Sequence, residues 1–374
     1  MKVAFYAPIK PPDHPIASGD RLIARNLLKA MQHIDIEAEL ASSYIAYSKR
    51  PATEILQEKK EGALAEAQSI ETALRASPPD IWLTYHPYCK APDWIGAHVS
   101  QALNIPYVTV EACRSGQRGP SGEDVWKTWR EEAQNGIRSA DLHICFKPSD
   151  RRYLEELKIS ESKIFDLAPF FDASLPETLP DISLPSHWRD DVPRLITTAM
   201  MRPGKKVENF RILANALKPL QSLPWNLTIV GGGPAEDKIK DFFADFDPAR
   251  LNWTGLLTRE AVLSHMKSSD LFVWPGWREP IGMVFLEAQL MGLPVTAMES
   301  MGVPLVVAQG KTGLLSDETQ PDQDPAPLSE VLSTLISHPT LRGDMADRAP
   351  VYAKQNHSLE TAAQELLRAF KKVL

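Results

Sequence analysis

The sequence predicts an α/β protein with two doubly wound domains. At 374 residues the chain is long for one hydrophobic core and comfortable for two. Short apolar runs of strand length alternate with longer segments of helical apolar spacing, which is typical of parallel sheets flanked by helices. The alternation stops in a proline-containing stretch from Asp172 to Pro193 and then starts again.

The first half reads as repeated strand–helix units. Strands are expected at 2–7, 36–41, 80–84, 107–110, 142–146 and 164–167. Helices are expected at 21–31, 54–76, 94–103, 123–140 and 149–157. This order predicts a Rossmann-like domain over residues 1–173, followed by a linker over 174–193.

The second half repeats the pattern over residues 194–355. Strands are expected at 194–199, 227–230, 251–253, 271–274, 295–297 and, more weakly, 313–315. Helices are expected at 208–218, 235–243, 259–268, 283–291 and 328–338. The tail from 356 to 374 has amphipathic spacing and reads as a last helix.

Charge and hydropathy exclude several partner classes. The formal net charge is −7 and no long block of Lys or Arg occurs, so we expect no nucleic-acid partner. The basic pairs Lys49-Arg50 and Lys59-Lys60 lie among glutamates, so membrane contact is expected to be peripheral at most. The apolar run before Pro8 is too short for a signal peptide, and no stretch approaches a membrane span. We therefore expect a cytoplasmic protein.

Neither the cysteines nor the one acidic motif indicates a metal site. Cys89, Cys113 and Cys145 follow no ligand spacing, and we interpret them as free thiols that serve packing. Asp322-Gln323-Asp324 has a D-x-D form but lies in a proline-rich acidic loop with no strand before it. We interpret it as a solvated loop, and no metal and no cofactor are predicted.

Two glutamates flank a glycine where a loop turns into an apolar helix. Glu279 precedes Gly282, and Glu287 lies one turn inside the expected helix. The first amides of such a helix carry partial positive charge that suits a phosphate. A buried strand precedes this segment and another follows it, which is the arrangement in which open parallel sheets bind ligands.

These residues resemble a known signature. Glu279-x7-Glu287, within Glu-x-x-Gly-Met-x-x-Leu-Glu-Ala-x-x-x-Gly-x-Pro-Val, resembles retaining, nucleotide-sugar-dependent glycosyltransferases of the GT-B fold, especially glycosyltransferase family 4. The resemblance implies two Rossmann-like domains facing a central cleft, with the acceptor on the first, the donor on the second, and the last helix packing back across the junction. It also implies a retaining, hexosyltransferase-like enzyme for which the nucleotide-sugar is a co-substrate.

In the second half, the resemblance gives roles to groups that follow strands. Arg202 and Lys206, with Lys205 as a rival, would project from a loop and hold the donor phosphates. Glu279 would hold sugar hydroxyls and Glu287 the ribose diol. Further donor-binding residues would be the glycine-run residue Gly232, the base contact Leu256, and the helix-start residues Gly282, Met283 and Val284.

In the first half, the resemblance points to three residues. Gly19 lies in a loop before a helix, where a glycine permits close approach of a ligand to the backbone. His86 ends a strand at the position where relatives place a histidine facing the donor, although a lone histidine is often structural. Glu111 stands where many relatives have a second histidine, and it either contacts acceptor hydroxyls or caps a helix.

The sequence therefore predicts transfer of a sugar from a UDP- or GDP-sugar to an unidentified hydroxyl on a glycan, lipid or small metabolite, with retention and without a metal. Two alternatives stay open. One is a catalytically silent nucleotide-sugar-binding protein, and the other is an epimerase or hydrolase on the same fold.

Overall fold

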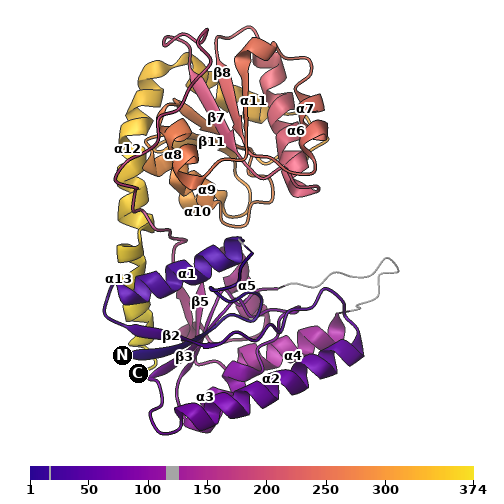
Figure 1. Cartoon of the computed structure of the whole chain (residues 1–374), viewed down its shortest axis with the longest axis vertical. Helices are drawn as coiled ribbons and strands as arrows, with labels where there is room; N and C mark the ends of the chain where they lie inside the picture. Colours follow the sequence, from indigo (N-terminus) through magenta and orange to yellow (C-terminus); the bar gives the residue numbers. More distant parts are fainter. Residues whose placement is uncertain (17, 115–125) are drawn as a thin grey trace. The chain divides into compact units, whose positions relative to one another are not determined.

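A computed structural model describes residues 1–16, 18–114 and 126–374. The chain divides into two compact units (Figure 1). The first unit comprises Met1–Phe170 together with Leu359–Leu374, and the second comprises Phe171–Ser358. Within the described residues, each unit contains one six-stranded sheet in which all strand pairs are parallel.

The first unit has the strand order β2-β1-β3-β4-β5-β6. Its strands are β1 (Lys2–Tyr6), β2 (Glu37–Ser42), β3 (Ile81–Tyr85), β4 (Tyr107–Val110), β5 (Leu142–Cys145) and β6 (Ile164–Asp166). Its helices are α1 (Gly19–Gln32), α2 (Thr53–Leu74), α3 (Ile95–Leu103), α4 (Lys127–Arg138), α5 (Pro148–Glu156) and α13 (Leu359–Phe370). Helices α1 and α13 pack together on one face of the sheet, and α2, α3 and α4 cover the other (Figure 1).

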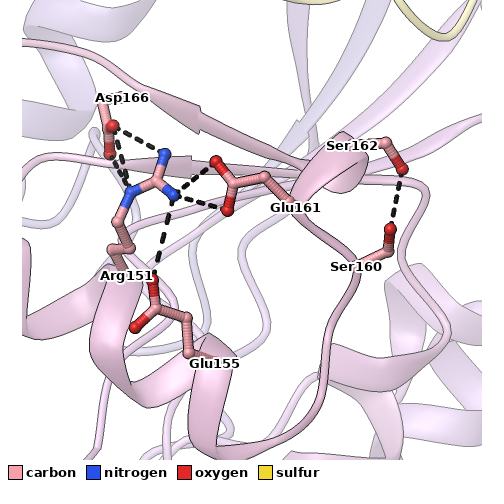
Figure 2. Close-up of polar contacts among 6 residues, drawn as sticks. All are labelled: Arg151, Glu155, Ser160, Glu161, Ser162 and Asp166. Carbon is pink, nitrogen blue, oxygen red and sulfur yellow. Dashed lines mark hydrogen bonds and ion pairs between the residues drawn. The ribbon is translucent and has the colours of Figure 1, made fainter.

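The edge strand of this sheet is fastened to α5 by one arginine. Arg151 of α5 donates to Asp166 of β6 and, at 2.7 Å, to Glu161 in the short helix η1 (Glu161–Lys163) (Figure 2). The two carboxylates raise the pKa of the guanidinium. Because Arg151 is engaged in this ion-pair network, we assign it a structural role.

The second unit has the strand order β12-β11-β10-β7-β8-β9. Its strands are β7 (Arg194–Thr198), β8 (Asn226–Val230), β9 (Leu251–Gly255), β10 (Leu271–Val273), β11 (Val295–Met298) and β12 (Gly313–Ser316). Its α-helices are α6 (Lys205–Leu217), α7 (Glu236–Phe242), α8 (Arg259–Lys267), α9 (Met283–Leu290), α10 (Val303–Val306), α11 (Ala326–Ser337) and α12 (Pro339–His357). One layer contains α6, α7 and α11, and the other contains α8, α9 and α12 (Figure 1).

The predicted α/β class is confirmed, and most predicted elements lie within a few residues of the observed ones. The part of the predicted helix at 123–125 lies outside the described residues. No helix or strand occurs between β6 and β7, where the linker was expected. The linker region packs on the second unit, since Trp188 donates its indole N–H to the carbonyl of Ala249 at 2.8 Å.

Helix α12 was not predicted. Pro350 lies inside it and normally signals a helix end. Its buried residues are Met345, Ala349, Ala353 and His357, which recur every four residues. This stripe is too narrow to stand out in a polar segment, and the helix forms because the stripe packs against α9.

The first turn of α6 also differs from the prediction. Helix α6 begins at Lys205 rather than at 208, so Lys205 and Lys206 are helical rather than loop residues. Gly204 at the N-cap has φ +92°, a conformation that glycine adopts easily, and it turns the chain into the helix. The prediction placed these lysines in the correct connection but in the wrong element.

Candidate active site

The second unit has a topological switch point between β10 and β7. Its strand order corresponds to the dinucleotide-binding order 3-2-1-4-5-6, with β7 as strand 1 and β10 as strand 4. Connections leave β7 and β10 in opposite directions across the sheet, and ligands of open α/β sheets bind beyond the strand ends at this point. The connection after β7 contains Arg202, and the connection after β10 contains Glu279.

Lys206 and Glu279 form an ion pair where these connections meet. The Lys206 Nζ lies 2.9 Å from Glu279 Oε2, and 5.3 Å from the centroid of the Trp274 ring. The side chains are 37% and 19% exposed, so water reaches both. Arg202 and Lys205 are exposed, and among the described residues neither has an ion-pair partner. Arg202, Lys205 and Lys206 thus present positive charge to solvent.

Several hydrogen bonds hold the Glu279 loop in place. Buried Asn209 of α6 accepts from the Trp277 N–H at 2.8 Å and donates to the Trp277 carbonyl at 3.1 Å. Ser300 accepts from the Arg278 N–H at 2.9 Å. The Gly302 N–H donates to the Glu279 carbonyl at 3.0 Å. This support orients the carboxylate before any ligand arrives, which favours selective binding.

The N-terminus of α9 lies directly after this loop. Gly282 is its N-cap with φ +84°, and no side chain of the described residues caps it. A Cβ at Gly282 would meet Phe285 at 2.5 Å, so this turn requires glycine. The N–H groups of Met283 and Val284 precede the first hydrogen bond of the helix, which Phe285 donates to the Gly282 carbonyl at 2.9 Å, and they carry partial positive charge.

Glu287 lies one turn inside α9. Its side chain is 28% exposed, and its Oε1 lies 3.4 Å from Nε of Arg259 in α8. Burial raises the pKa of Glu287, and the positive charge of Arg259 opposes that rise. The carboxylate therefore has one weak partner and remains able to accept further hydrogen bonds.

Backbone hydrogen bonds join the loops after β7, β8 and β9. The Met201 N–H donates to the Gly232 carbonyl at 3.0 Å, and the Gly231 N–H donates to the Gly255 carbonyl at 2.9 Å. Leu256 is 75% exposed, and a Cβ on Gly232 would lie 3.2 Å from its Cγ. The predicted donor-binding residues of this unit therefore come from adjoining connections at one edge of the sheet.

The first unit has its own switch point, between β1 and β3. There His86 Nδ1 lies 3.1 Å from Asp20 Oδ1, in the first turn of α1, and Nε2 lies 3.3 Å from Cys113 Sγ. Gly19 is the first residue of α1, not a loop residue, because Ser18 caps the helix by accepting from the Arg21 N–H. A Cβ on Gly19 would meet nothing within 4 Å, so the space above it is open.

A buried charge network surrounds His86. Glu111 accepts from Lys147 and, at 3.1 Å, from the Tyr85 hydroxyl, so both carboxylate oxygens are engaged. Lys147 also lies 3.6 Å from Asp150. Burial raises the pKa of Asp150 to about 6, although Lys147 opposes this rise. Burial alone would lower the pKa of His86, but the negative charge of Glu111 and the contacts with Cys113 and Asp20 raise it well above its usual value.

The structure thus brings the predicted residues into two groups, one in each unit. The second unit contains Arg202, Lys206, Gly232, Leu256, Glu279, Gly282, Met283, Val284 and Glu287; the first contains Gly19, His86 and Glu111. Sequence reasoning did not assign roles to Asp20 and Lys147, and it interpreted Cys113 as a packing residue. A usable signal was their position, because each follows a strand or begins a helix at the carboxyl edge of the sheet.

The described residues offer neither a metal-ligand cluster nor a membrane-spanning helix. They contain no group of three or more His, Cys, Asp or Glu residues arranged to hold a metal ion. Asp322 and Asp324 are exposed loop residues, as expected for a solvated segment. No helix in this part of the chain combines the length and apolarity needed to span a membrane.

The second unit is similar to known glycosyltransferases. Residues 192–338 match the family model described as glycosyl transferases group 1. All of the matched residues lie in the second unit. A D-inositol 3-phosphate glycosyltransferase of Corynebacterium urealyticum is 36% identical over 112 residues, which cover 30% of this chain and 25% of that relative. An alpha-D-kanosaminyltransferase of Streptomyces kanamyceticus is 26% identical over 185 residues, covering 49% and 47%.

Solved glycosyltransferases share the fold over the whole chain. A glycosyltransferase of Rickettsia africae aligns with a TM-score of 0.67 and 17% identity, covering 100% of this chain and 98% of that one. Anabaena HepE in complex with UDP aligns with a TM-score of 0.67 and 16% identity, covering 99% and 100%. The predicted GT-B fold is therefore confirmed. The matched part is only about a quarter of the length of the first curated relatives.

Proposed function

We propose that this chain is a glycosyltransferase that moves a sugar from a UDP- or GDP-sugar to a hydroxyl acceptor. The observation that carries the proposal is the Lys206–Glu279 pair at the switch point of the second unit. It lies inside the segment that matches the group 1 glycosyl transferases. The pair consists of a cation and a carboxylate, and the carboxylate lies three residues before the N-cap of α9 and can accept from hydroxyls.

The proposed phosphate site consists of Arg202, Lys206 and the first amides of α9. When the bond between sugar and phosphate breaks, negative charge grows on the departing diphosphate. Fixed cations and amides stabilise that charge more strongly than they stabilise the ground state. In the free protein Lys206 is paired with Glu279, and we propose that the diphosphate takes over as partner of Lys206. Glu279 is then released to accept from sugar hydroxyls.

Glu287 is proposed to accept from the ribose diol. A carboxylate with one contact at 3.4 Å retains the acceptor capacity that two hydroxyl donors need. Solved structures of Anabaena HepE contain UDP and UDP-glucose, which supports a uridine nucleotide as the first ligand to test. The names of the two relatives share no acceptor, and the acceptor class of this chain stays unassigned.

In the first unit, both ring nitrogens of His86 have partners, so His86 is proposed to orient the donor sugar or its phosphate through its positive charge, and Glu111 to hold it in that charged form. Glu111 has both oxygens engaged, so this electrostatic role fits its contacts better than direct acceptor binding. Retention is proposed because the Glu279-x7-Glu287 motif resembles retaining enzymes. The observation that both ring nitrogens of His86 already have partners supports it, since an inverting enzyme needs a free general base.

The proposal can be tested by screening nucleotides and nucleotide-sugars by thermal shift, with EDTA present throughout. A ligand that binds only the folded state raises the melting temperature by mass action. Proton NMR of the first product from the selected donor should then show the donor's anomeric configuration. An inverted product would contradict retention. Free sugar formed regardless of acceptor would support the hydrolase alternative, and binding without any product would support the silent binding protein.

A further inference from the structure

Cys113 belongs to a chain of three interacting groups in the first unit. Its sulfur lies 3.3 Å from Nε2 of His86, whose Nδ1 lies 3.1 Å from the carboxylate of Asp20. A nucleophile beside a base, with the base oriented by a third group, is the arrangement that activates thiols. We propose that Cys113 is the reactive cysteine of this chain and the site at which hydroperoxides and soft electrophiles modify it.

The local backbone fixes this arrangement. His86 has φ +60°, a conformation uncommon for residues other than glycine, and its N–H donates to the Val110 carbonyl at 2.8 Å. Cys113 pairs through its backbone with Tyr88. The Tyr88 ring lies 5.3 Å from the His86 ring, and the Tyr85 ring lies 5.6 Å from it. The imidazole is therefore held with one nitrogen toward the sulfur.

The charges around the imidazole keep a cation beside the sulfur. Glu111 and Asp20 both stabilise protonated His86, whose ring contacts the Cys113 sulfur. Lys147 adds a further positive charge in the same network.

The other two cysteines differ in accessibility. Cys89 and Cys145 are 1% and 2% exposed, whereas Cys113 is only partly buried. Burial also raises the pKa of Cys145, which keeps it in the unreactive thiol form. The three thiols therefore provide an internal comparison within one protein.

The reaction with hydrogen peroxide needs no other reactant. The Cys113 thiolate attacks one peroxide oxygen, an S–O bond forms and the O–O bond breaks. Sulfur is oxidised to sulfenic acid, and the peroxide is reduced to hydroxide, which takes a proton from the imidazolium to become water. A thiol reductant would reverse the oxidation.

Native full-length protein at pH 7 can be treated with iodoacetamide and followed by mass spectrometry of each cysteine peptide. We expect Cys113 to be alkylated at least about tenfold faster than Cys89 or Cys145, because its sulfur is more accessible and lies against a protonated imidazole. His86→Asn, which suits the left-handed backbone, and Asp20→Asn should each slow Cys113 about fivefold or more. His98→Asn is the matched control, since His98 pairs with Glu71 at 3.1 Å in the same unit.

Equal alkylation rates for the three cysteines would overturn the proposal, as would an unchanged Cys113 rate in both test variants. If His86→Asn does not fold, Asp20→Asn decides, because it leaves the imidazole in place. Hydrogen peroxide followed by a sulfenic-acid trap should label Cys113, and label on another cysteine alone would contradict the proposal.

A consequence for activity rests on the proposed function. If His86 orients the donor, oxidation of its sulfur partner should lower transfer, and a thiol reductant should restore it. Peroxide-treated and untreated samples of the wild type and Cys113→Ser are compared as ratios for each protein. Selective labelling without loss of transfer would contradict this consequence only. Absence of any transferase activity would contradict the proposed function and leave the labelling result intact.

Discussion

Each unit has an ion pair near its switch point, and the two pairs differ in their exposure to water. In the second unit, the Lys206–Glu279 pair is open to water and adjoins the exposed cations Arg202 and Lys205. In the first unit, Lys147 and Glu111 are 11% and 5% exposed and are satisfied by each other and by Tyr85. An exposed pair exchanges partners easily, whereas a buried pair resists separation. We infer that the second switch point is built to receive an anion, and that the first is built to fix His86.

The largest expected difference is in stability. Lys147→Met leaves Glu111 buried without its cation, and we expect the free energy of unfolding to fall by about 3–5 kcal/mol. Lys206→Met removes the cation from the partly exposed pair and should change the free energy of unfolding by less than about 1 kcal/mol. Urea unfolding of both variants measures the contrast. Equal losses would show that the two pairs do not differ as described.

The second prediction concerns transfer. Arg202→Ala and Lys206→Ala should each remove roughly 2–4 kcal/mol of transition-state stabilisation, measured from kcat/KM, because each removes an electrostatic contact to the departing diphosphate. Lys205→Ala is the matched control in the same helical turn and should be much milder. If Lys205→Ala is the more damaging lysine change, the assignment of Lys206 is wrong.

The third prediction concerns His143, a buried histidine in the sheet of the first unit. His143 in β5 is fully buried, its Nδ1 contacts Thr109 at 2.7 Å, and burial lowers its pKa to about 4. The unfolded chain binds a proton near pH 6.5 and the folded chain does not, so stability is complete above pH 6.5 and falls as the pH approaches 4. The expected loss is about 3 kcal/mol. In His143→Gln, the slope of unfolding free energy between pH 6.5 and 4 should be flatter; an unchanged slope would assign the loss to other groups.

The fourth prediction separates the two glutamates of the second unit. Glu287→Ala should weaken UDP or GDP binding by about 1.5 kcal/mol, roughly tenfold in Kd, because a ribose contact persists in the free nucleotide. Glu279→Ala should mainly lower turnover, because its proposed contact is with the sugar. Calorimetry and kinetics on both variants measure the difference. Similar effects of both changes on nucleotide affinity would refute these roles.

The sequence predicted the fold well where local pattern and burial agree. Buried strands such as β3 and β8 are mostly apolar, and Gly282 and Gly204 mark turns with positive φ. Helix α12 escaped prediction because its stability comes from packing against α9 rather than from its own pattern.

The site could be predicted where its residues lie close together in the sequence. Glu279, Gly282 and Glu287 lie within nine consecutive positions. The network of His86 with Asp20, Cys113 and Lys147 joins residues up to 127 positions apart in the chain, counting from 20 to 147. These contacts depend on strand order and on the left-handed turns at His86 and Glu111. Neither feature can be inferred from the spacing of residues along the sequence.

The central claim is that the second switch point binds the nucleoside diphosphate of the donor without a metal ion. Titration calorimetry of UDP and GDP in EDTA tests it most directly, with wild type, Lys206→Ala and Lys205→Ala compared. The account predicts binding of one nucleotide by the wild type in EDTA, clear weakening in Lys206→Ala and a near-normal affinity in Lys205→Ala. Loss of all nucleotide binding under chelation, or equal affinity in wild type and Lys206→Ala, would contradict it.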